Sequence, residues 1–243
     1  MKNFAKVLAV AAVAVFLVAG SAWATYINPI GGDGPNTDLQ TLLNGIGSTI
    51  DVDDDQLSDA ADSYWNLTAS GGSVTTLIFE FAGFSNINSF GVYNGSQTVE
   101  LFDGAAYNPD AQAMFSIRAD GSVRVNNVDT FIDFAGDTFG YYLQNDTGIF
   151  YSDTSKNNNG VDMMVAYQGK DSDIVTIPGY TAGLWTDSEF ILAWEDTMNG
   201  DSDFNDFVVM VESVDPVPEP ATMFLLGSGL VGLGVIGRKK KVA

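Results

Sequence analysis

Residues 139–152 read FGYYLQNDTGIFYS, two aromatic-rich runs joined by Asn145-Asp146-Thr147-Gly148. Aromatic residues are enriched in β-strands, and Asn, Asp and Gly tolerate the backbone angles of tight turns. The same arrangement occurs upstream, where Asn94-Gly95 separates FGVY from QTVELF. Both stretches therefore predict antiparallel β-hairpins.

Most of the remaining chain is divided in the same way. Short runs rich in Val, Ile, Thr, Phe and Tyr alternate with clusters of Gly, Asn, Asp and Ser, which favours antiparallel strands over alternating strands and helices. The expected strands cover residues 74–81, 88–93, 97–102, 113–118, 122–126, 128–133, 139–144, 148–152, 161–168, 189–195 and 207–213. Residues 25–216 thus predict an all-β fold, a single antiparallel β-sandwich or jelly-roll-like domain.

One stretch of this domain predicts a helix. Thr37-Asp38-Leu39-Gln40 has the form of a capping box, and Leu39, Leu42 and Leu43 have helical spacing. We therefore expect one short helix near the N-terminal end of the domain.

The composition excludes many kinds of catalysis. The chain has 243 residues, of which 31 are acidic and 10 are basic, with no His and no Cys. An imidazole base, a thiol nucleophile and a thiolate metal site are therefore all excluded. The oxygen ligands that remain suit calcium rather than transition metals. We expect a protein that is not an enzyme; a glycosidase that uses two carboxylates is the less favoured alternative.

The basic residues are concentrated at the two ends of the chain. Only Arg118, Arg124, Lys156 and Lys170 lie between the ends, so 4 basic residues face 31 acidic ones there and the net formal charge is −27. Such a surface repels nucleic acid and anionic lipid, and we expect no nucleic-acid partner.

Both ends have the composition of targeting segments. Residues 1–24 have a Lys-bearing start, an apolar run and Ala22-Trp23-Ala24, which predicts a secretory signal peptide; an uncleaved membrane anchor is the alternative. Residues 221–237 are uncharged and precede Arg238-Lys239-Lys240-Lys241, which predicts a transmembrane helix whose basic end stays in the cytoplasm.

Pro218-Glu219-Pro220 directly precedes this apolar segment. The order of Pro-Glu-Pro, a Gly-rich span and a basic end that begins at Arg238 resembles the PEP-CTERM sorting signal of bacterial envelope proteins, and we assign residues 217–243 to it. The resemblance implies export, an exosortase-type sorting machinery as partner, anchoring in the inner membrane during transit, and a final location at the cell surface or in extracellular matrix. A tail anchor whose linker contains two prolines is the alternative.

The strongest candidate site is the acidic turn before the last expected strand. Oxygen side chains that alternate along a turn can converge on one calcium ion. The predicted ligands come from this turn and the preceding strand end: Asp201, Asp203, Asn205, Asp206, Glu195 and Asp196. Glu212 stands at position 12 of an EF-hand spacing. The expected strand between Asp206 and Glu212 would, however, place Glu212 roughly 20 Å from Asp206. The alternative is a solvated turn whose side chains cap their own backbone.

The same turn carries a second resemblance. Trp194-Glu195-Asp196, followed by GDSDFND at residues 200–206, is similar to a domain of unknown function often found ahead of PEP-CTERM tails, over about residues 85–213. The resemblance is consistent with the expected fold, exported location and metal binding, and implies no reaction.

Two further features leave alternatives open. Asp51, Asp53 and Asp55 either form a second cation site or lie in a solvated loop. Exposed aromatic residues on a β-sandwich can stack on sugar rings. The available rings are Trp65, Trp185, Tyr141, Tyr142 and Tyr151. A calcium-dependent carbohydrate-binding module that acts on extracellular polysaccharide is therefore the alternative function.

Overall fold

The computed structural model describes residues 27–32, 34–68, 72–80, 87–102, 112–177 and 179–218. The expected signal peptide and transmembrane helix lie outside these residues, as do Glu219, Pro220 and Arg238 of the sorting motif, whereas Pro218 is described and exposed. Within the described part of the chain, no helix has the length and apolar character needed to cross a membrane.

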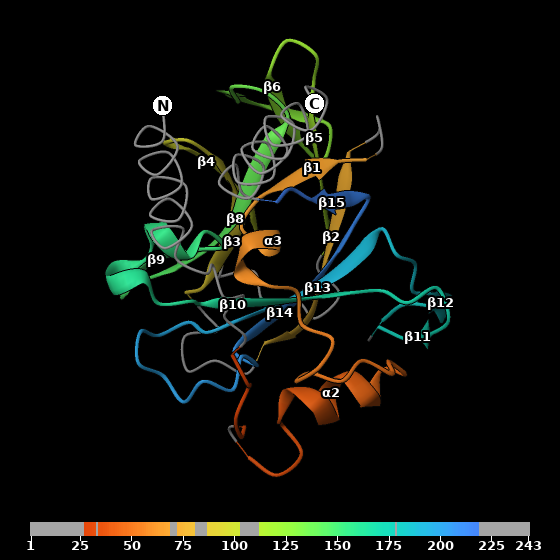
Figure 1. Ribbon diagram of the computed structural model, residues 1–243. Helices are drawn as coiled ribbons and strands as arrows, with labels where there is room; N and C mark the ends of the chain where they lie inside the picture. The colour runs from red at the N-terminus through yellow and green to blue at the C-terminus, as the bar shows by residue number, and fades with distance from the viewer. Residues whose placement is uncertain are drawn as a thin grey trace, which may run out of the picture.

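Two antiparallel β-sheets form the body of the protein (Figure 1). The seven-stranded sheet has the order β10 (Met164–Gln168), β13 (Glu189–Trp194), β14 (Phe207–Glu212), β2 (Ser73–Glu80), β5 (Gln112–Ile117), β6 (Ser122–Val125) and β7 (Val128–Asp133). The six-stranded sheet has the order β15 (Val214–Pro216), β1 (Trp65–Leu67), β8 (Thr138–Asn145), β3 (Ser89–Asn94) and β4 (Gln97–Phe102), with β9 (Gly148–Tyr151) also paired to β8. The expected all-β antiparallel sandwich is confirmed.

Both expected hairpins are present. Asn145 pairs with Gly148 across a two-residue loop, and Asn145 Oδ1 accepts a hydrogen bond from Thr147 N at 2.8 Å. In the upstream hairpin Asn94 pairs with Gln97, and Gly95 has a φ of 59°, which glycine adopts at little cost. Local turn chemistry therefore sets these two registers.

Four short strands were not expected from the sequence. They are β1, β15, β11 (Ile174–Val175) and β12 (Gly183–Leu184). Each has two or three residues, which is too short for an alternating pattern to be recognised. Two single-turn 3₁₀ helices, Thr154–Lys156 and Asn158–Gly160, follow β9.

Three neighbouring strands of the seven-stranded sheet, β10, β13 and β14, are buried on both faces. Alternate residues of β13, Phe190, Leu192 and Trp194, belong to the main core between the two sheets, where the Trp65 and Phe190 rings lie 4.9 Å apart in an edge-to-face arrangement. The residues between them, such as Ile191, belong to a second apolar cluster on the outer face. Strands that are buried on both faces are apolar throughout, as EFILAW and FVVMVE nearly are.

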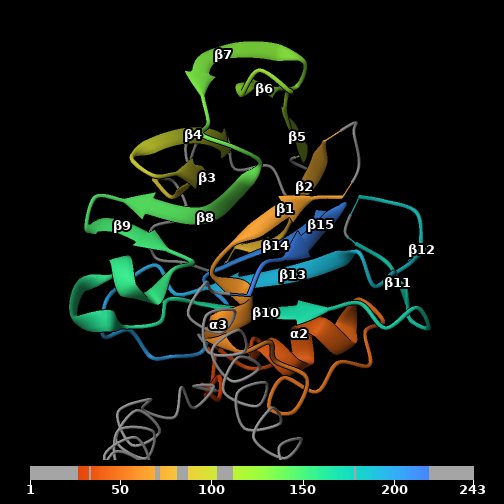
Figure 2. The same ribbon diagram turned by 45° about the horizontal axis from the view of Figure 1, so that its top comes forward.

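Helix α2 (Leu39–Gly45) covers the outer face of this sheet, as Figures 1 and 2 show. Leu39 and Leu43 are buried in the second apolar cluster. The expected capping box is wrong by one residue, because Asp38 is the N-cap and its Oδ1 accepts a hydrogen bond from Thr41 N at 2.9 Å. The Gln40 side chain instead accepts from Val52 N at 3.0 Å. A second, four-residue helix, α3 (Asp59–Asp62), was not expected.

Candidate metal site

The candidate site is the loop that joins β13 to β14. Three of its non-glycine residues, Asn199, Ser202 and Phe204, have positive φ angles of 64°, 64° and 53°. Such angles are uncommon outside glycine and bring the loop back on itself. Ile30 N donates a hydrogen bond to Ser202 O at 2.8 Å, so the N-terminal segment holds the outside of the loop.

Three carboxylates of the loop converge. Glu195, Asp201 and Asp203 each offer an oxygen, and these oxygens lie within 4.8 Å of one another. Glu195 and Asp203 are 4% and 1% exposed, whereas Asp201 is exposed to solvent. The cluster therefore has a buried base and one open side, an arrangement that could hold a metal ion.

The loop backbone fixes the position of Glu195. Its Oε1 accepts a hydrogen bond from Phe204 N at 2.8 Å, and its Oε2 lies so close to Gly200 that a Cβ there would overlap it. Burial, together with the negative charges of Asp203 and Asp201, raises the pKa of Glu195 to about 7. A cation bound among these three carboxylates would favour the ionised form of Glu195 and lower its pKa again.

The side chain and backbone of Asn205 are hydrogen-bonded to Asp203. The Asp203 carboxylate accepts from Asn205 N at 3.1 Å and from Asn205 Nδ2 at 2.6 Å, and Nδ2 also donates to Thr37 O at 2.8 Å. Asn205 Oδ1 is fully buried and accepts no hydrogen bond. A buried polar atom without a partner costs about 1–3 kcal/mol, and any cation that Asn205 Oδ1 coordinated would remove that cost.

The remaining predicted ligands, Asp196 and Asp206, lie at the base of the loop and outside the three-carboxylate cluster. Asp206 Oδ2 accepts from Asp196 N at 3.0 Å, and Asp196 Oδ2 accepts from Asn88 Nδ2 at 3.2 Å. Burial first, and then the charges of Asp196, Glu195 and Asp203, raise the pKa of Asp206 to about 8. The structure therefore brings the buried acids of this loop close to one another.

Two asparagines that contact the loop were missed in the sequence, Asn145 at the end of β8 and Asn88 directly before β3. Asn145 Nδ2 donates to Asp196 O at 2.7 Å and to Asn88 Oδ1 at 3.1 Å. Asn145 and Asn88 are 51 and 108 residues away from Asp196 in the sequence, so no local pattern indicated these contacts. The loop is thus attached to both sheets.

Glu212 lies at the far end of β14. It pairs with Glu189, whereas Phe207, at the loop end of the same strand, pairs with Trp194. The rejection of the EF-hand spacing is therefore confirmed.

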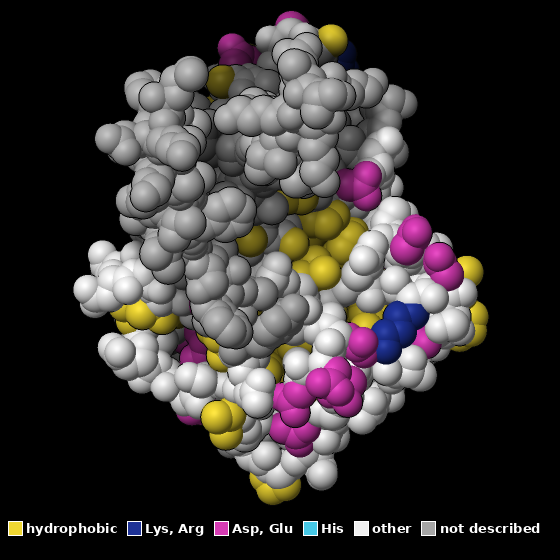
Figure 3. Space-filling model, in the orientation of Figure 1, with side chains coloured by type: hydrophobic (Ala, Val, Ile, Leu, Met, Phe, Trp, Pro, Cys, Tyr) yellow, Lys and Arg dark blue, Asp and Glu magenta, His cyan; other side chains and the backbone are white. Residues whose placement is uncertain are grey.

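The second acidic run forms a turn that caps its own backbone. Asp55 Oδ2 accepts from Asp51 N at 2.8 Å, and Asp51 Oδ1 accepts from Asp53 N at 3.1 Å. Lys170 Nζ forms an ion pair with Asp55, so a lysine supplies the positive charge there. These contacts favour the solvated loop over a second cation site. On the face shown in Figure 3, acidic side chains outnumber basic ones.

The aromatic residues considered for sugar stacking are mostly buried. Trp65, Trp185 and Tyr141 are 0% exposed and Tyr142 is 3% exposed. Tyr151 is half-buried, and its ring lies 5.1 Å from Lys156 Nζ. Four of these five rings therefore serve as core and not as an exposed platform.

Two parts of the chain match models of known protein families. Residues 108–214 match the Domain of unknown function (DUF4114), and residues 216–241 match the PEP-CTERM protein-sorting motif. The resemblance drawn from the sequence is thus confirmed, and the sorting motif supports an exported protein that transits the membrane before exosortase processing. No curated protein and no solved structure matches this chain.

Proposed function

We propose that this protein is a non-catalytic component of the cell surface or extracellular matrix, whose β-sandwich is stabilised by one calcium ion in the β13–β14 loop. The observation that carries the proposal is the convergence of Glu195, Asp201 and Asp203, in a loop that also holds the unpartnered Asn205 Oδ1. The sorting motif supports the exported location.

The dimensions of the cluster fit calcium. Calcium binds oxygens at 2.3–2.6 Å, so two ligands on opposite sides of the ion lie about 4.6–5.2 Å apart. The three carboxylate oxygens lie within 4.8 Å of one another, inside this limit. Carboxylates can bind through one or both oxygens, and water can fill the remaining positions on the exposed Asp201 side.

The ligand chemistry favours calcium over transition metals. The chain has no His and no Cys, and the cluster offers only carboxylate and amide oxygens. Hard oxygen ligands suit calcium and magnesium, and the flexible geometry of calcium tolerates the irregular arrangement of a loop better than the strict octahedron of magnesium does.

A bound ion would hold the β13–β14 loop in contact with several segments that are distant in the sequence. The loop contacts the N-terminal segment through Ile30 and Thr37, and the six-stranded sheet through Asn88 and Asn145. An exported chain without Cys has no disulfides to join such segments. Calcium therefore takes the role that cross-links have in many secreted domains.

The test compares thermal unfolding of the full chain, purified in detergent, with calcium and with a chelator. An ion that binds only the folded state stabilises it by about 2.7 kcal/mol at 100 times its dissociation constant. For a domain of this size the melting temperature should rise by roughly 5–11 °C. Magnesium at the same concentration should give a smaller rise.

Two variants locate the effect. Asp203→Asn and Asp201→Asn should each reduce the calcium-dependent rise, and the exposed Asp201 makes the second variant the safer one for folding. Asp137→Asn removes one exposed charge from the β7–β8 loop and is the matched control. A rise that is absent in the parent chain, or unchanged in both loop variants, would refute the proposed site.

A further inference from the structure

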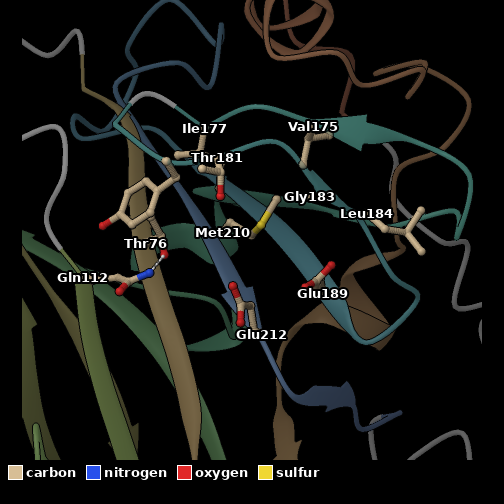
Figure 4. A pocket seen from close by; sticks show the side chains of 11 residues that line it. Thr76, Gln112, Val175, Ile177, Thr181, Gly183, Leu184, Glu189, Met210 and Glu212 are labelled. Atoms are coloured by element: carbon tan, nitrogen blue, oxygen red, sulfur yellow. Dashed lines mark hydrogen bonds between the residues drawn. The ribbon is translucent and has the colours of Figure 1, made fainter.

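A pocket of about 180 Å³ lies on the outer face of the seven-stranded sheet (Figure 4). Its floor comes from β14, β2, β5 and β13, and its other side is lined by Val175, Ile177, Tyr180, Thr181, Gly183 and Leu184. The pocket includes Glu212, whereas the β13–β14 loop begins beyond the other end of the same strands. It is therefore separate from the candidate metal site.

Two carboxylates line one part of the pocket. Glu189 and Glu212 are directly opposite each other on β13 and β14, so both side chains lie on the same face of the sheet. Thr186 N donates a hydrogen bond to Glu189 Oε2, which fixes one of the two carboxylates. Like charges directly opposite each other destabilise a strand pair.

The burial of Glu212 increases this cost. Burial and the negative charge of Glu189 raise the pKa of Glu212 above its ordinary value. None of the described residues that line the pocket is Lys or Arg. The pair therefore lacks a positive partner among its lining residues.

The other walls are mainly apolar. Val175, Ile177 and Met210 contribute aliphatic and thioether surface, and Val175 and Ile177 are 5% and 9% exposed. A neutral polar pair closes one side, where Gln112 Nε2 donates to Thr76 Oγ1 at 3.1 Å, as drawn in Figure 4. A ligand for this pocket needs a positive group at one end and an apolar remainder.

We propose that the pocket binds a primary ammonium group carried on a short aliphatic chain. The ammonium has three donors for the carboxylates of Glu189 and Glu212, and the chain contacts Met210, Ile177 and Val175. The pocket volume of about 180 Å³ is sufficient for a ligand of a few heavy atoms. The carboxylates disfavour an anion, and a bare divalent ion would make no use of the apolar wall formed by Val175, Ile177 and Met210.

The experiment is a titration of the full chain in detergent with n-propylammonium chloride, followed by the ¹³C-methyl resonances of its methionines. Met210 lies in the pocket, and Met164, buried in the main core, is an internal control. The Met210 signal should shift with saturation while the Met164 signal stays. 1-Propanol, which has the same chain without the charge, should bind about tenfold more weakly or not at all, because a hydrogen bond to a charged group contributes about 1.5–3 kcal/mol.

Variants separate the carboxylates from general surface charge. Glu212→Gln and Glu189→Gln should each raise the dissociation constant of propylammonium about tenfold, while the remote Asp137→Asn leaves it unchanged. Methylammonium, which lacks the chain, should bind more weakly than propylammonium. A Met210 signal that does not saturate, equal binding of 1-propanol, unchanged affinity in both Gln variants, or a Met210 shift caused by calcium in place of the amine would overturn the proposal.

Discussion

Replacing Asp162 by Asn should stabilise the protein at alkaline pH and leave its stability in acid nearly unchanged. Asp162 precedes β10 and forms a carboxyl–carboxylate hydrogen bond with Asp59 of α3. Its Oδ1 also accepts a hydrogen bond from Met164 N at 3.2 Å. Asn can keep both interactions, since its amide donates to Asp59 and its carbonyl accepts from Met164.

The magnitude follows from the shift of the Asp162 pKa. Burial, and then the charge of Asp59, raise this pKa from 3.8 to about 7. A group with a raised folded-state pKa contributes stability that is fully present below its unfolded-state pKa and is lost as the pH rises through its folded-state pKa. The contribution should therefore be present near pH 4, be lost between about pH 4 and 7, and amount to about 4 kcal/mol as an upper figure.

The assay is urea unfolding of the full chain and of Asp162→Asn at pH 5 and pH 8, without added calcium. The difference in unfolding free energy between variant and parent should favour the variant by about 2–3 kcal/mol more at pH 8 than at pH 5, where part of the contribution of Asp162 is already lost. Comparing the two chains cancels the titration of other buried acids such as Glu195 and Asp206. Asp137→Asn is the control for loss of one exposed charge. An equal difference at both pH values would refute the reasoning.

Two further substitutions test local features of the fold. Gly200→Ala places a Cβ against Glu195 Oε2. The calcium-dependent rise in melting temperature should therefore become smaller, while the melting temperature in chelator changes little. An unchanged rise would contradict the role of Glu195. Asp38→Ala removes the side-chain acceptor of Thr41 N at the start of α2 and should lower the unfolding free energy by about 1 kcal/mol, as measured by urea unfolding at neutral pH. The control Asp38→Asn should retain most of the stability. Equal losses in both variants would argue against a capping role.

The C-terminal end of the chain allows a separate test of the sorting motif. Protein recovered from the cell surface or matrix should lack the basic end from Arg238 to Lys241, because exosortase processing removes it. Mass spectrometry of the recovered protein would show whether this basic end is missing. Recovery of the intact basic end would favour a retained tail anchor.

Much of the strand content could be predicted because its signals are local. Turn residues at Asn145 to Gly148 and at Gly95 mark the hairpins, and the observed strands β3, β4, β8 and β9 lie within one residue of the expected ranges at most of their ends. The error at the helix start had a local cause as well. Thr37 and Asp38 are both good N-cap residues, and contacts of Thr37 Oγ1 with Gly34 left Asp38 as the cap.

The candidate site was only partly predictable. All six predicted residues lie in or next to the β13–β14 loop, since their order along the chain already placed them there. Which of them converge depends on the positive φ angles at Asn199, Ser202 and Phe204, which nothing in the composition of the turn specifies. The attachment of the loop to Asn88 and Asn145 depends on contacts between the two sheets.

The sequence by itself determined the longer β-strands, the acidic turn and the sorting motif, because periodicity, turn chemistry and targeting signals are properties of neighbouring residues. Only the tertiary structure decided which acids meet. Glu189 and Glu212 became a pair through the register of β13 and β14, and Asp59 and Asp162 through the packing of α3 against β10. Strand register and sheet order result from burying side chains that are distant in sequence, so the buried carboxylates follow from the packing of the core.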